Sequence, residues 1–209
     1  MENIIGYYLE GVWQPADKRV YKKYFNHTVA VAYLENELLE SLNREMDTIL
    51  KNSPGAFYSA VRFLFAELTY LSHLYWGYIP KKKNEGKDVA KFMRKFKILS
   101  PTYGLHYEVF RHGLLHTHHP KWIKKGGKIA EWYIGSDVKL KRFGIYLPEF
   151  YAEIKNSINL FVEELEEEQI QGKKTRLNKM FEGFSEAVKI LSVQDLSTYS
   201  KNDFTKLKL

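Results

Sequence analysis

Hydrophobic side chains recur at intervals of three and four residues along most of this chain, a spacing typical of amphipathic helices. The pattern begins near Thr28 and continues to Leu50, which corresponds to about five helical turns. Ser53 and Pro54 are suited to start a second helix, because serine caps helices and proline tolerates the first helical position. This second helix should run to about Gly77, and since it is apolar nearly all round we expect it at the centre of the fold.

The helical pattern continues through the second half of the chain. After a short cationic helix, another helix should begin at Ser100 and Pro101 and must end before Pro120, since proline cannot continue the hydrogen-bond ladder. Two longer helices follow, joined at Gly172. The ranges expected for the short helix and the two longer ones are 86–96, 149–170 and 174–191.

Three segments depart from this pattern. Residues 128–146 are rich in β-favouring side chains around the turn 135–137, which predicts a β-hairpin. Residues 1–25 are aromatic-rich and are expected to form an arm or short helix on the body, and 195–209 lack periodicity and are expected to be a peripheral tail. The pattern as a whole predicts a mainly α protein, a helical bundle with one small β-hairpin, in a single domain spanning 1–209.

Composition narrows the class of protein. The 209 residues are 44% hydrophobic, enough for a substantial core, and contain no cysteine, which excludes disulfides, thiolate metal sites and cysteine nucleophiles. The longest apolar run, 57–79, is interrupted by Arg62, Glu67 and His73, so we expect a buried helix and not a membrane span. Residues 1–6 lack the charged start and apolar core of a secretion signal, which favours a cytoplasmic location.

Positive charge is concentrated in the middle of the chain. Residues 81–142 contain 16 lysines and arginines against 5 acidic residues, a balance of +11 in a chain whose total is +7. Such a field suits a polyanion, for example RNA, although surface lysines can also serve only solubility. The candidate nucleic-acid contacts are Lys81, Lys82, Lys83, Lys121, Lys124 and Lys125.

One segment inside this basic region concentrates side chains suited to chemistry. Residues 107–120 read Tyr-Glu-Val-Phe-Arg-His-Gly-Leu-Leu-His-Thr-His-His-Pro, so Arg111 is followed at once by His112 and, after four intervening residues, by His116. Arginine stays charged and forks onto phosphate oxygens, whereas imidazole exchanges protons near neutral pH. Together these groups are suited to metal-free chemistry on a phosphodiester.

This Arg-x4-His motif, with a polar residue directly after the arginine, resembles the signature of the HEPN superfamily of all-helical nucleotide-binding domains, many of which are ribonucleases. The resemblance implies a four-helix core, in which the hairpin is an insertion, and a homodimer whose two motifs face one cleft. It also implies RNA cleavage without metal or cofactor by attack of the 2′-hydroxyl on the adjacent phosphate. His116 would move the proton, Arg111 would stabilise the developing charge, and His112 would aid orientation.

Such an activity suits a toxin or defence component controlled by an antitoxin protein. A non-catalytic module that binds nucleic acid or nucleotides is the main alternative, because fold alone does not guarantee activity. In a structural alternative, Arg111 pairs with Glu108 or another buried carboxylate and the histidines form hydrogen bonds in a polar interior. The acidic run at 163–168 is expected to be a solvated face or a contact for the basic segment of a partner subunit.

The spacing within the motif leaves its geometry open. On a regular helix Arg111 and His116 differ by about 140°, whereas His112 and His116 share a face. A frayed helix end, the length of the arginine side chain, or a site completed by two subunits could each bring the groups together.

A third function is a metalloprotein built on imidazoles, which suit zinc, copper, nickel or iron. Its candidate ligands are His112, His116, His118 and His119. No carboxylate lies between His112 and Trp122, and the sequence contains neither a phosphate-binding loop nor a nucleophile elbow.

Overall fold

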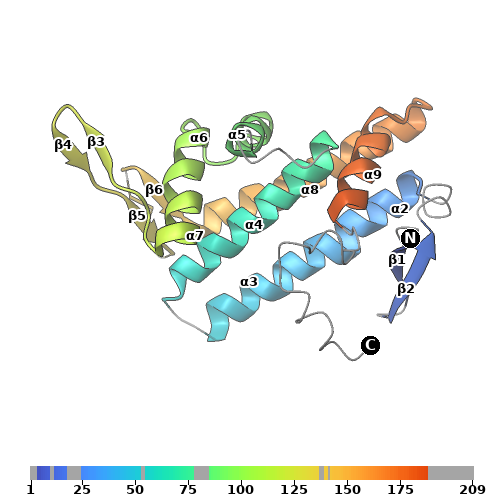
Figure 1. The fold of residues 1–209 in the computed structure, drawn as a ribbon, viewed down its shortest axis with the longest axis horizontal. Coiled ribbons are helices and arrows are strands. Elements are labelled where there is room, and N and C mark those ends of the chain that lie inside the picture. Colours follow the sequence, from blue (N-terminus) through green and yellow to red (C-terminus); the bar gives the residue numbers. More distant parts are fainter. Residues whose placement is uncertain are drawn as a thin grey trace, which may run out of the picture.

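A computed structural model describes residues 4–9, 12–17, 25–52, 55–77, 85–136, 139–140 and 142–187. Most of these residues are helical, which confirms the predicted mainly α bundle, and the strands form small two-stranded sheets. Figure 1 shows three long helices, α3, α4 and α8, side by side, with the strands at the ends of the bundle. The expected tail at 195–209, the helix start at Ser53 and Pro54, and Lys81, Lys82 and Lys83 lie outside the described residues.

The first long helix follows the predicted range and contains one irregularity. It comprises α2 (His27–Ala32), a π-helical segment η1 (Tyr33–Leu39) and α3 (Glu40–Asn52). The side chain of Asn26 caps it by accepting a hydrogen bond of 3.0 Å from the Val29 backbone N–H. The apolar repeat therefore located this helix correctly.

Helix α4 (Phe57–Trp76) lies at the centre of the bundle, as its apolar composition predicted. It contacts α3, α5, α8, α9 and the motif-bearing helix, and ten of its residues are buried. It ends at Gly77, whose φ of +80° is accessible to glycine, and a Cβ there would come within 2.7 Å of the Lys179 Cα. Within the described part of the chain, no helix is both long and apolar enough to cross a membrane.

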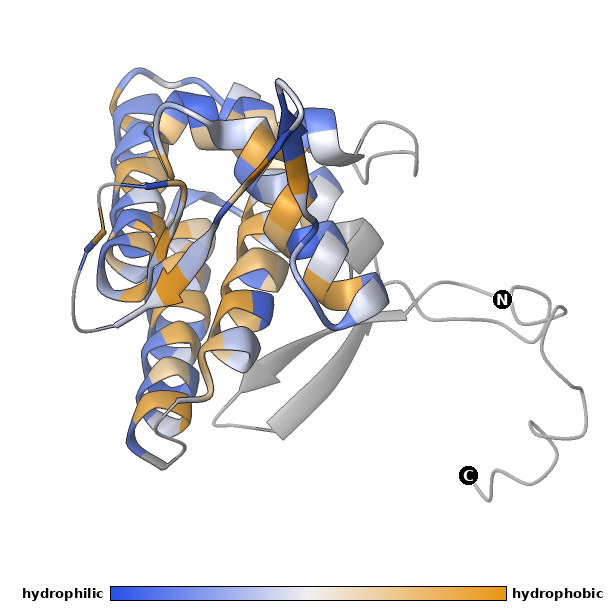
Figure 2. Cartoon of the chain, turned by 90° about the vertical axis from the view of Figure 1, so that its left-hand side faces the viewer, coloured by the Kyte–Doolittle hydropathy of each residue, from blue (hydrophilic) through white to orange (hydrophobic). Residues whose placement is uncertain are grey.

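Three further helices complete the bundle close to their expected positions: α5 (Glu85–Phe96), α8 (Leu147–Ile170) and α9 (Thr175–Ala187). The helices carry both hydrophobic and hydrophilic residues, which Figure 2 shows in orange and blue. Their buried apolar residues meet in one hydrophobic cluster that includes Phe65, Phe92, Phe150 and Phe161. This burial holds the helices together.

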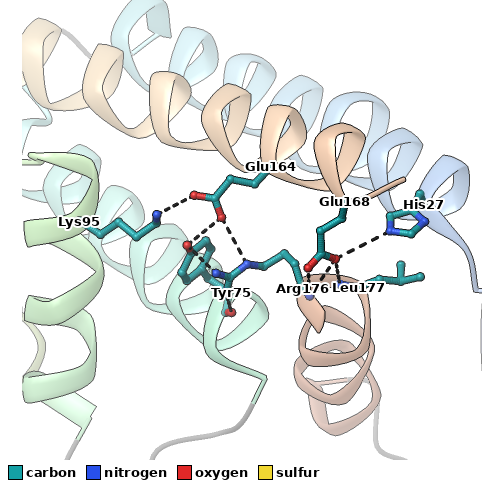
Figure 3. Close-up of polar contacts among 7 residues, drawn as sticks. All are labelled: His27, Tyr75, Lys95, Glu164, Glu168, Arg176 and Leu177. Atoms are coloured by element: carbon teal, nitrogen blue, oxygen red, sulfur yellow. Dashed lines mark hydrogen bonds and ion pairs between the residues drawn. The ribbon is translucent and has the colours of Figure 1, made fainter. Parts of the chain in front are cut away.

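Part of the acidic run on α8 is half-buried and makes contacts with other helices. Glu164 accepts a hydrogen bond of 2.8 Å from the Tyr75 hydroxyl and pairs with Lys95 at 2.6 Å (Figure 3). Glu168 accepts hydrogen bonds from the backbone N–H groups of Arg176 and Leu177 at the start of α9. These two carboxylates therefore join α8 to α4, α5 and α9, whereas the remaining members of the run, Glu163, Glu166 and Glu167, are exposed.

The small sheets differ from the predicted hairpin at 128–146. The hairpin pairs β3 (Ile123–Lys125) with β4 (Lys128–Ala130), because Gly126 and Gly127 adopt positive φ and close a two-residue turn. Within the predicted range, β5 (Tyr133–Gly135) instead pairs with β6 (Gly144–Tyr146) in parallel, so the expected turn at 135–137 does not join hairpin strands. Parallel pairing depends on contacts far apart in sequence, which alternation within one segment cannot reveal.

The amino-terminal segment also contains strands and not the short helix considered for it. β1 (Ile4–Leu9) and β2 (Val12–Asp17) pair antiparallel, with Tyr8 opposite Trp13. The β-favouring aromatic residues of this segment agree with strand formation.

Candidate functional site

The motif lies on a composite helix made of α6 (Tyr103–His106), the π-helical segment η2 (Tyr107–His112) and α7 (Gly113–Thr117). Thr102, and not Ser100, occupies the N-cap position, and the peptide bond between Ser100 and Pro101 is cis. The helix therefore begins two residues later than predicted from the Ser-Pro pair.

The π-helical segment ends within the motif. A π-helix closes hydrogen bonds over five residues and so holds more residues in each turn than an α-helix. This widening applies to the turn that leads into the motif, whereas the step from Arg111 to His116 runs through the α-helical segment α7. Arg111 and His112 are the last residues of this widened turn, and His116 follows in the α-helical turn after it.

Gly113, the residue between the two parts of the motif, allows the chain to fold back on the helix. His118 adopts a left-handed conformation with φ of +59°, and the chain then returns so that a Cβ on Gly113 would come within 2.5 Å of the His119 carbonyl oxygen. The Thr117 hydroxyl donates to the Gly113 carbonyl at 2.8 Å, and the Lys121 N–H donates to the Val109 carbonyl at 2.9 Å. The motif is thus held by the segment that follows it.

His112 contacts His116, and it shares the Tyr107 ring with Arg111. Its ring centroid is 5.8 Å from that of His116 and 5.5 Å from that of Tyr107, and the Arg111 guanidinium lies 5.4 Å from the same Tyr107 ring. Tyr107 is buried, Arg111 and His112 are half-buried, and His116 is exposed. The three sequence-predicted residues therefore form one patch on a buried aromatic base.

The surroundings of His112 lower the pKa of its imidazole. Partial burial lowers the pKa of His112, the charges of Arg111 and Lys121 lower it further, and Glu108 opposes them. Glu108 forms an ion pair with Lys121, whose hydrogen bond holds the pKa of Glu108 below its ordinary value. At neutral pH His112 is therefore a neutral imidazole that can accept a proton beside a fixed positive charge.

The other histidines of the segment point elsewhere. His118 Nδ1 lies 2.9 Å from the Arg62 guanidinium, and the His119 ring lies 5.8 Å from Tyr58 and 6.0 Å from Trp132. In the described part of the chain, no three histidine or acidic side chains are grouped so that they could hold a metal ion. This geometry gives no support to the four-histidine metal site.

The described lysines that were predicted to contact nucleic acid differ in whether they already have an acidic partner. Lys124 and Lys125 are exposed on β3, whereas Lys121 is exposed but is engaged by Glu108.

The sequence analysis did not identify two side chains that lie near the motif in the structure, Arg62 and Trp122. Arg62 on α4 donates from Nε to the Leu114 carbonyl at 3.1 Å, and Trp122 stands exposed beside the motif. An arginine inside an otherwise apolar helix was the available signal for Arg62.

Comparisons of the chain with protein-family models, with curated proteins and with solved structures give no match. The arrangement itself combines a permanent cation, a neutral imidazole and an exposed imidazole on one surface. These groups are able to bind a phosphodiester, to remove a proton from a hydroxyl and to return a proton to a leaving oxygen.

Proposed function

We propose that this protein is a metal-independent endoribonuclease of the HEPN type. The observation that carries the proposal is that His112, a half-buried imidazole with a lowered pKa, lies 5.8 Å from His116 and contacts the Tyr107 ring together with Arg111. The basic surroundings of this patch favour the approach of a polyanion. The motif's resemblance to the HEPN signature adds to this support.

In the proposed reaction, a neutral imidazole of His112 or His116 takes the proton of a ribose 2′-hydroxyl, and the 2′-oxygen attacks the adjacent phosphorus. Arg111 stabilises the negative charge that develops on the non-bridging oxygens. The bond to the 5′-oxygen then breaks, and this oxygen receives a proton from an imidazolium. The products are a 2′,3′-cyclic phosphate and a free 5′-hydroxyl.

Cleavage of single-stranded RNA in excess EDTA tests the proposal. Wild type should cut the RNA, and His116→Ala or His112→Ala should slow cleavage by about 10²–10⁴-fold. Arg111→Ala should slow cleavage by a comparable factor, because it removes the group that stabilises the charge developing on the phosphate oxygens. The matched control for Arg111→Ala is Arg44→Ala, which alters an exposed arginine of α3 outside the patch and should leave the rate unchanged.

Other outcomes point to the alternative functions. RNA binding with no cleavage in any variant would indicate a binding module. Activity that disappears in EDTA and returns with zinc would indicate a metalloprotein.

We further propose a homodimer that brings two motifs together, as the HEPN resemblance implies. Leu115, next to His116, is 48% exposed and provides an apolar contact for a second copy. Light scattering should give a dimer for wild type and a monomer for Leu115→Glu, while Ile170→Glu, on an 87% exposed residue at the end of α8, should remain dimeric. A toxin or defence role with an antitoxin partner would follow from this activity.

A further inference from the structure

The hairpin of β3 and β4 carries an unusual concentration of positive charge. No acidic residue occurs in 109–130, and the hairpin contains Lys124, Lys125 and Lys128, all of them exposed. Lys125 lies directly opposite Lys128 across the two-residue turn. Like charges placed opposite one another destabilise a strand pair, so stability alone does not account for this arrangement.

The outer face of the hairpin carries an exposed apolar side chain beside a lysine. In the antiparallel register Ile123 pairs with Ala130 and Lys124 pairs with Ile129, so the two pairs lie on opposite faces. Ile123 packs against the core, whereas Ile129 is 64% exposed and Trp122, just before β3, is 66% exposed. A tryptophan beside lysines, exposed to this degree, is typical of an interaction surface.

Packing fixes the tryptophan relative to the motif. The rings of Trp122 and Trp132 lie 5.8 Å apart, and Trp132 in turn lies 6.1 Å from Phe110, the residue before Arg111. The backbone hydrogen bond from Lys121 to Val109 ties the base of the hairpin to the same helix. Figure 1 shows the hairpin projecting beyond the motif-bearing helix at the end of the bundle.

We infer that the β3–β4 hairpin binds single-stranded RNA, with one unpaired base stacked on Trp122 and neighbouring phosphates held by Lys124 on the outer face and by Lys125 and Lys128 beside the turn. Charge complementarity selects a polyanion, and the exposed indole selects the unpaired form, because a base in a duplex has no free face for stacking. The inference rests on the proposed function. It specifies that the RNA brought to Arg111, His112 and His116 is single-stranded.

Binding is measured by fluorescence anisotropy with a labelled 12-nucleotide RNA in EDTA, on the full chain carrying His116→Ala so that the RNA stays intact. Adding Trp122→Ala should weaken binding at least about fivefold, the lower end for loss of one base–aromatic stack. Trp122→Phe keeps an aromatic ring and should retain most of the affinity. The matched control for an exposed apolar side chain is Ile170→Ala, which should bind as the parent does.

The charged contacts are tested through salt dependence. The pair Lys124→Ala and Lys125→Ala should reduce the slope of log affinity against log salt by about 1.4, as expected for two phosphate contacts to a single strand. The control pair Lys173→Ala and Lys174→Ala removes two adjacent exposed lysines between α8 and α9 and should leave the slope unchanged.

Equal affinity of Trp122→Ala and its parent would overturn the inference, as would binding of a 12-base-pair duplex as tight as that of the single strand. A change of oligomeric state on Trp122→Ala would also overturn it, because this surface would then belong to a contact with a second copy. Cleavage by wild type together with unchanged Trp122→Ala binding would refute the hairpin alone. Binding that depends on Trp122 without cleavage by wild type would refute only the ribonuclease proposal.

Discussion

Arg62 donates a hydrogen bond of 3.1 Å from its Nε to the carbonyl oxygen of Leu114, which links the central helix α4 to the last turn of the motif-bearing helix. The same guanidinium lies 2.9 Å from His118 Nδ1, where the helix ends. A cation at a helix carboxyl terminus satisfies a carbonyl that has no partner within the helix and opposes the helix dipole. Arg62 is therefore a positioning residue for the patch of Arg111, His112 and His116.

Replacing Arg62 with methionine keeps the length of the side chain and removes these hydrogen bonds. We expect the free energy of unfolding in urea to fall by about 1–2 kcal/mol, because a half-buried carbonyl loses its donor. Arg44→Met, on an exposed residue of α3, is the control and should change stability by less than about 0.5 kcal/mol. Equal effects of the two substitutions would contradict the assigned role.

Gly113 should not tolerate a side chain. A Cβ there would lie 2.5 Å from the His119 carbonyl oxygen and 2.6 Å from the Lys121 nitrogen, and both are backbone atoms that cannot rotate away. Gly113→Ala should therefore lower the unfolding free energy by about 1–3 kcal/mol. Gly104→Ala, in the same helix, meets only the Ala90 Cβ at 3.5 Å and should be neutral or slightly stabilising. Thermal denaturation of both variants distinguishes local crowding from a general effect of alanine.

Glu168 should contribute to stability as a cap supplied by a neighbouring helix. Its carboxylate accepts backbone N–H groups of Arg176 at 2.7 and 2.9 Å and of Leu177 at 3.2 Å (Figure 3), so Glu168→Ala should cost about 0.5–2 kcal/mol. Glu168→Gln retains an acceptor oxygen and should lose less. The adjacent and exposed Glu167 provides the control, and chemical denaturation of Glu167→Ala should match wild type.

His106 should make the fold sensitive to acid. It is buried, and its Nε2 lies 2.9 Å from the Gly144 carbonyl while its Nδ1 lies 3.0 Å from the Thr102 hydroxyl. Burial lowers the pKa of His106, and the hydrogen bonds to the backbone carbonyls of Gly144 and Thr102, the latter 3.2 Å from Nδ1, only partly oppose this. The unfolded chain therefore binds a proton near pH 6.5 while the folded chain does so at lower pH, so stability falls as the pH drops through this interval.

This loss of stability amounts to about 1.4 kcal/mol for each unit by which folding lowers the pKa. Urea unfolding at pH 7.5 and pH 5 should show a smaller difference in His106→Gln than in wild type. A pH dependence that is the same in His106→Gln and wild type would place the acid sensitivity in other groups.

The helices could be located from the sequence because their formation depends on a pattern that repeats within a few residues. Helix α4 was placed at the centre by its apolar composition, helix α8 begins and ends within a few residues of its expected range, and helix α9 begins one residue from its expected start. Each helix buries one apolar face, and the spacing of hydrophobic residues within the helix shows directly which face that is. The motif was visible for a similar reason, since its three side chains lie within six consecutive residues.

Tertiary structure decided every relation between residues that are distant in sequence. The parallel pairing of β5 with β6, the contact of Arg62 with Leu114 and the capping of α9 by Glu168 all join separate elements. No periodicity encodes such contacts, because each depends on how whole helices pack against one another. Even within the motif, the sequence determined which side chains are present, whereas packing on the Tyr107 ring and the returning segment against Gly113 determined how they are arranged.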